Sequence, residues 1–154
     1  MNSTTCSTRA CTLDELNPSL KTAMHAHTQH YGMDDSESNI LMCCETKSLM
    51  QKNGLFGGQE TSLSAAYVTP KWLVWAVLSN GNTVSAGSAL LSQIEARSYE
   101  TTAMYAIMPN HGLNITGRYT GGNRTGMTFI SLGTEPDGQN FQQVLKKALN
   151  KTAK

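Results

Sequence analysis

The segment that decides the fold is the apolar run Trp72-Leu-Val-Trp-Ala-Val-Leu78. In a β-strand, successive side chains point to opposite faces, so this run would present an apolar surface on both sides. Such a strand is stable only where other elements cover it above and below. We therefore predict a central strand at 72–78 that is packed on both faces.

Turn sequences divide the chain on either side of this run into further short strands. Thr69-Pro70 precedes the run, and a proline interrupts the hydrogen bonds of a strand ladder. Asn80-Gly81 follows it and is typical of a two-residue hairpin turn. The remaining strands are predicted at 39–49, 64–68, 94–99, 103–108, 112–119 and 127–132. Because short turns join neighbouring strands, we expect an antiparallel sheet.

Two other stretches have helical periodicity. Asn17-Pro18 is an N-cap followed by proline, and apolar side chains then recur at helical spacing as far as Tyr31, just before Gly32. This pattern predicts a helix at 18–31. A second helix is predicted near the end of the chain from a single apolar stripe formed by Phe141, Val144, Leu145, Ala148 and Leu149.

The length of 154 residues is that of one ordinary domain with additions. Residues 1–12 carry no periodic apolar face, so we expect a flexible tail there. An N-terminal helical segment follows at 13–33 and a barrel domain at 34–154. The fold class is expected to be α+β, mainly β: a small antiparallel seven-stranded barrel closed by the C-terminal helix, with an additional N-terminal helix. A barrel of this kind leaves few open sheet edges.

Four segments follow one another in a characteristic order. Val68-Thr-Pro-Lys-Trp-Leu-Val-Trp75 leads into a strand, and Leu90-Leu-Ser-Gln-Ile-Glu95 is a turn that enters another strand. Gly126-Met-Thr-Phe-Ile130 and 141–149 would be a last strand and a closing helix. In this order the chain resembles the bacterial pleckstrin-homology-like (PH-like) domains over about residues 37–149. The resemblance implies a PH-like barrel that presents a strand edge or rim to a protein partner.

Charge argues against nucleic-acid and lipid partners. Twelve Lys and Arg face eleven Asp and Glu, for a net charge of +1, so the chain has no strong field to attract polyanions. Phosphoinositide-binding members of the wider family use several convergent cations. In the corresponding region this chain offers Lys47 and Lys52, with Glu60 nearby. We expect no nucleic acid as a partner and no strong phosphoinositide or membrane binding.

The histidines and cysteines do not form a convincing metal site. His25, His27 and His30 lie within six residues, but on a helix the first two point about 200° apart. The cysteines lack paired C-x-x-C spacing; they are Cys6, Cys11, Cys43 and Cys44. Cys43 and Cys44 are adjacent on a predicted strand and would face opposite sides, so at least one should be buried.

The sequence contains no signature of catalysis. We find neither a G-x-S-x-G nucleophile elbow nor a phosphate-binding loop that continues into Gly-Lys-Ser/Thr. We therefore predict no catalytic, cofactor-binding or metal-binding residues, and no enzyme activity. The N-terminal stretch has no apolar segment of signal-peptide length, so we expect a cytoplasmic protein.

The expected function is a non-enzymatic binding or assembly module that acts through protein–protein contacts. The alternative is a small apolar-ligand carrier, because eight methionines would suit an adaptable cavity. A filled barrel interior would favour the module, and a continuous apolar cavity would favour the carrier. The partner is either another protein or a second copy. Self-association would use helix 18–31 or a strand edge, unless that helix docks on its own barrel.

Overall fold

The computed structural model describes residues 3–33, 35–51, 57–79, 83–107 and 110–152. Within these ranges the strands form two antiparallel sheets, one of five strands and one of three. The larger sheet contains, in spatial order, β1 (Ser3–Ala10), β2 (Met42–Gln51), β3 (Gln59–Val68), β4 (Trp72–Ser79) and β5 (Thr83–Leu90). The smaller sheet contains β6 (Ile94–Ser98), β7 (Gly112–Arg118) and β8 (Thr125–Ser131).

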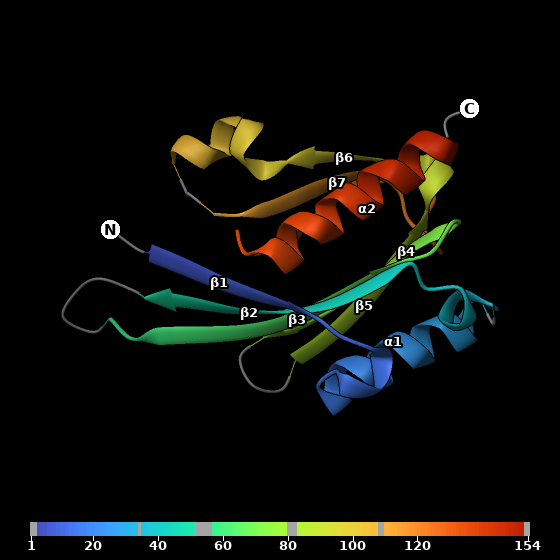
Figure 1. Ribbon diagram of the computed structural model, residues 1–154, viewed down its shortest axis with the longest axis horizontal. Helices are drawn as coiled ribbons and strands as arrows, with labels where there is room; N and C mark the ends of the chain where they lie inside the picture. Colours follow the sequence, from blue (N-terminus) through green and yellow to red (C-terminus); the bar gives the residue numbers. More distant parts are fainter. Residues whose placement is uncertain (1–2, 34, 52–56, 80–82, 108–109, 153–154) are drawn as a thin grey trace.

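Two α-helices lie on opposite faces of the larger sheet. Figure 1 shows α1 (Pro18–His30) below this sheet, and α2 (Pro136–Thr152) above it together with the smaller sheet. The α+β, mainly β class and the C-terminal helix are therefore confirmed. The described strands form two separate sheets and not a closed ring, which corrects the expectation of a closed barrel.

The central strand β4 is covered on both faces, as its sequence predicts. Leu73 and Trp75 belong to a buried cluster with Phe141 of α2. Val74, on the opposite face, belongs to a second cluster with Leu20 of α1. The two clusters form separate cores on the two sides of one sheet.

Helix α1 begins and ends as the sequence predicts. The Asn17 side chain accepts a hydrogen bond from the Ser19 N–H at 2.9 Å, and Gly32 ends the helix with a φ of 66°. Leu20 and Met24 are buried between α1 and the sheet. The apolar stripe of α1 is thus covered by its own chain, which leaves a strand edge as the other predicted contact for self-association.

Strand β1 occupies most of the segment predicted to be a flexible tail. It pairs with β2 from Ser3↔Gln51 to Ala10↔Cys44. The sequence does not predict this strand, because polar contacts hold it in place and it has no periodic apolar face. The Thr8 and Thr46 hydroxyls are 2.8 Å apart in the interior, and Thr8 Oγ1 also accepts a hydrogen bond from the Gly133 N–H at 2.7 Å.

The outer edge of β1 is covered by carboxylates that precede and begin α2. The Thr8 N–H donates to Glu135 Oε2 at 2.7 Å, and the Ala10 N–H donates to Asp137 Oδ2 at 2.8 Å. The hydrogen bond from Thr8 is the main reason that the pKa of Glu135 lies below its usual value. These contacts satisfy donors that would otherwise be open to another strand.

Two further predictions differ from the structure. In place of the strand expected at 103–108, Ala103–Ala106 form a 3₁₀ turn, and residue 108 lies outside the described residues. The apolar side chains of Met104 in this turn and of Ile107 after it are exposed. Strand β5 was not predicted, because Thr83–Leu90 is rich in small residues and has weak alternation. The Asn-Gly turn before it lies outside the described residues.

Truncating one buried side chain in each cluster tests whether β4 is packed on both faces. We expect Leu20→Ala and Leu145→Ala each to reduce the free energy of unfolding by about 2–5 kcal/mol, because both leucines are fully buried. Their effects should add, because the residues belong to different clusters. Urea denaturation measures both, with Ile107→Ala as the exposed control. A Leu20→Ala variant as stable as the control would contradict packing of α1 on the sheet.

Candidate functional site

An open groove of about 500 Å³ runs along β6 beside the end of α2. Four consecutive residues, 94–97, form its strand side, and Leu149, Asn150 and Thr152 form its helix side. Successive strand side chains point to opposite faces, so a groove bordered by all four residues follows the edge of the strand. The groove therefore exposes the backbone of β6.

Strand β6 has only one neighbouring strand in the described part of the chain. It pairs with β7 from Ile94↔Gly117 to Ser98↔Leu113, and it is the outer strand of its sheet. Its other edge faces the groove. Backbone N–H and C=O groups on such an edge accept an added strand.

Buried residues hold the groove in place. A 3₁₀ turn, η3 (Leu91–Gln93), leads from β5 into β6. Leu91 and Ile94 are buried in the same cluster as Leu145 of α2, so strand and helix share one core beneath the groove. Glu95 and Arg97 alternate with the inward residues and are exposed.

The structure also brings together a histidine and a serine that the sequence analysis does not predict to be in contact. His27 Nε2 on α1 is 2.8 Å from Ser88 Oγ on β5, and Ser88 donates to Thr120 Oγ1 at 2.8 Å. Ser88 has an exposed fraction of 0%, so a substrate would not reach its hydroxyl. The contact joins α1, β5 and the segment after β7. No local motif indicates it, because His27 and Ser88 are 61 residues apart.

The position of His27 leads to a prediction about how the free energy of unfolding depends on pH. Burial, and then the neighbouring His30, lower the pKa of the His27 imidazole below its ordinary value of 6.5. Protonation therefore favours the unfolded chain, and the stabilisation present above about pH 6.5 is lost as the pH falls. We expect the free energy of unfolding to decrease from about pH 8 to pH 5. His27→Gln should flatten this profile, and exposed His30→Gln, which removes only the smaller of the two causes, should flatten it less. Equal profiles for wild type and His27→Gln would refute the assignment.

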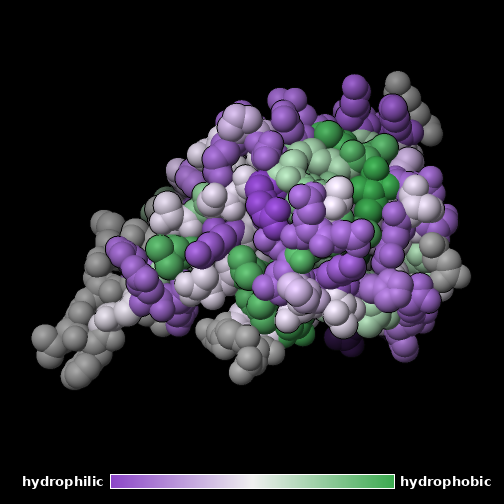
Figure 2. Space-filling view, turned by 60° about the horizontal axis from the view of Figure 1, so that its bottom comes forward, coloured by the Kyte–Doolittle hydropathy of each residue, from purple (hydrophilic) through white to green (hydrophobic). Residues whose placement is uncertain are grey.

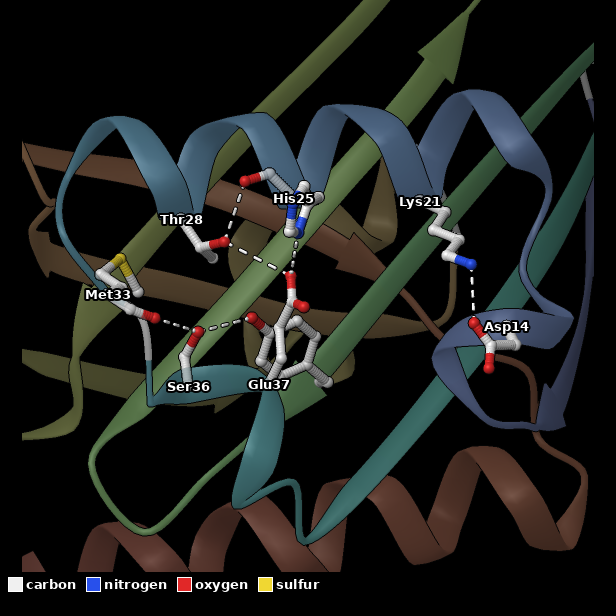
Figure 3. Close-up of polar contacts among 8 residues, drawn as sticks. Asp14, Lys21, His25, Thr28, Met33, Ser36 and Glu37 are labelled. Atoms are coloured by element: carbon white, nitrogen blue, oxygen red, sulfur yellow. Dashed lines mark hydrogen bonds and ion pairs between the residues drawn. The ribbon is translucent and has the colours of Figure 1, made fainter.

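The three histidines considered for a metal site do not converge on one point, although the rings of His27 and His30 both pack against Tyr31. His25 Nδ1 is 3.0 Å from Glu37 Oε1 (Figure 3), His27 contacts Ser88, and the His30 ring packs edge-on against Tyr31. Among the described residues, no three metal-ligating side chains form a group.

The cysteines are free thiols. Cys43 lies in the cluster beneath α1 and Cys44 in the cluster beneath α2, so the prediction that they face opposite sides is confirmed and both are buried. Burial raises the pKa of Cys44 to about 12 and also raises the pKa of Cys43. Because the thiolate is the nucleophile, these two cysteines are poorly suited to nucleophilic chemistry.

A second opening of about 320 Å³ lies where the two sheets diverge. The larger sheet contributes Ser48, Ser62 and Ser79 to it, and Asn110 and Phe129 border it on the other side. These hydroxyl and amide groups do not match the apolar cavity that a carrier would use. Between the sheets beneath α2, the space is filled by buried apolar side chains.

The two lysines considered for a lipid headgroup do not form a described cluster. Lys47 is an exposed residue of β2, and Lys52 lies outside the described residues. Neither helix in the described ranges is both long and apolar enough to cross a membrane.

Comparisons of the chain with protein-family models, with curated proteins and with solved structures give no match. The candidate site is therefore interpreted from its own geometry. Its main elements are the unpaired edge of β6 and the wall formed by the last turns of α2.

Proposed function

We propose that this chain is a non-enzymatic protein-binding module of bacterial PH-like architecture. A partner segment in extended conformation would add to the edge of β6 and lie in the groove beside α2. The single observation that carries this proposal is the unpaired strand edge beside an open groove of about 500 Å³. Strand addition is a common way in which proteins recognise peptides.

The order of elements supports the PH-like part of the proposal. From β2 onward, seven strands are followed by one amphipathic helix that packs against both sheets. This is the order that the sequence resemblance implies. Strand β1 and helix α1 are additions to it, one at the edge of the larger sheet and one on its outer face.

The packing of the interior favours a binding module over a ligand carrier. Trp75, Leu113 and Phe141 meet in one buried cluster between the larger sheet, the smaller sheet and α2. Large side chains thus occupy the space where a carrier would hold its ligand. The groove outside this core is the better place for a partner.

The groove also indicates which peptides should fit. Ala96 and Leu149 border it with apolar groups, and both pack against the core. Exposed Glu95 and Arg97 lie on the other face of β6. A suitable peptide would pair its backbone with β6 and place a medium-sized apolar side chain against Leu149. We place this module in the cytoplasm, which the four free thiols support.

Filling the groove should weaken peptide binding. Asn150→Trp places a bulky ring at the exposed helix wall of the groove, and Asn140→Trp is the matched control near the start of α2. Using peptides selected against the wild-type chain from a random library, we expect Asn150→Trp to weaken binding about tenfold or more. Asn140→Trp should leave the affinity unchanged.

Amide NMR shifts locate the bound peptide. Residues 94–98 should show the largest changes when a selected peptide is added, because their backbone groups gain new hydrogen bonds. Selected peptides that leave these signals unchanged, or that bind Asn150→Trp as well as wild type, would contradict the proposal.

A further inference from the structure

An exposed leucine lies at the rim of the larger sheet, between the layer of α1 and the layer of α2. Leu41 immediately precedes β2 and has an exposed fraction of 52%. Figure 2 shows one face of the molecule, on which hydrophobic side chains gather most densely toward the upper right, among hydrophilic ones. An exposed leucine at the rim is available to another surface.

On the α2 side of Leu41 the surface is apolar and basic. A groove of about 340 Å³ is bordered by Leu41, Pro70 and Val144, with Lys147 and Lys151 from the exposed face of α2. Leu41, Pro70 and Val144 form the apolar part of this groove. The two lysines are four residues apart and therefore lie on the same face of α2. This side suits an apolar group that is accompanied by carboxylates.

On the α1 side of Leu41 the surface is apolar and acidic. A second groove, of about 520 Å³, shares Leu41 with the first and is bordered by Leu13 and Ile40 together with Asp14 and Glu37. One residue therefore separates a basic groove from an acidic one. The two grooves supply opposite charges on the two sides of a common apolar centre.

We propose that Leu41 and its two grooves, the Leu41 rim, bind the same rim of a second copy of this chain. A two-fold axis through Leu41 exchanges the α1 side with the α2 side, so the lysines of each copy face the carboxylates of the other. The charge contact then occurs twice, with Leu41 of both copies at the centre. A second copy presents Leu41 between a basic and an acidic groove, so it matches the first copy in both apolar contact and charge.

The existing partners of the carboxylates do not prevent this contact. Asp14 is 2.6 Å from Lys21 (Figure 3), and this exposed pair is the main cause of the lowered pKa of Asp14. Asp14 is therefore ionised at neutral pH. Exposed ion pairs stabilise a fold only slightly, so its carboxylate remains available to a lysine of the second copy.

Glu37 is held at the same surface by contacts from α1. Its Oε1 lies 3.0 Å from His25 Nδ1 and 3.4 Å from Thr28 Oγ1 (Figure 3). These contacts fix the position of the carboxylate. Glu37→Gln keeps an amide oxygen for them and removes the charge, which makes it the suitable variant for a test.

Reversing the basic charges, and reversing Asp14 while neutralising Glu37, tests the proposal from the two sides of the rim. We expect the full chain to sediment as a dimer at high concentration, and both Lys147→Glu/Lys151→Glu and Asp14→Lys/Glu37→Gln to weaken dimerisation about tenfold or more. An equimolar mixture of the two variants should form a heterodimer, because opposite charges then meet on both sides of the axis. Higher salt should weaken the wild-type dimer.

A matched control reverses two charges on the other sheet. Arg118→Glu/Arg124→Glu changes the net charge by the same amount as the lysine variant at exposed positions outside the rim, and it should remain dimeric. Circular dichroism establishes that each variant is folded. A monomeric wild type at high concentration, a dimer that survives both reversals, or a mixture that stays monomeric overturns the proposal. The peptide groove at β6 is bordered by other residues of α2, namely Leu149, Asn150 and Thr152, so a wild-type dimer and a failed peptide test are separate results.

Discussion

The structure depends on one constraint, which is that the central strand β4 is apolar on both faces. A strand of this kind cannot lie at the surface of a two-layer fold, because one of its faces would then meet water. The chain therefore places a helix on each side of the larger sheet. Helix α1 is thus an essential layer, and Leu20 and Met24 supply the apolar groups that cover the second face.

Local periodicity accounts for the parts of the fold that the sequence predicts correctly. The stripe from Phe141 to Leu149 has helical spacing, and the run at 72–78 is a short apolar stretch bounded by proline and glycine turns, which favours a buried strand. Strand β1 has no such pattern, because Thr8 is held by a hydroxyl contact with Thr46. The segment predicted as a strand at 103–108 has a strand-like composition, but its described residues pair with no strand of the described part of the chain, and Ala103–Ala106 forms a 3₁₀ turn instead.

The candidate site is less accessible to sequence analysis than the core. The residues of β6 are predicted as a strand, but the position of β6 as an outer strand depends on which of the described strands pair with one another. Strand pairing is determined by contacts between residues far apart in the sequence, including those that cover the edge of β1. The contact between His27 and Ser88 is of the same kind, since it joins residues on two elements that approach each other only in the folded chain.

The carboxylates that cover β1 also have a consequence for how the chain folds. Thr8 and Glu135 are separated by 127 residues, as are Ala10 and Asp137, so β1 meets these partners only after the long intervening segment has been made. Until then its outer N–H groups are open to intermolecular pairing. Contacts between such distant residues are typical of slow folding, and the nascent chain is exposed to aggregation during that interval.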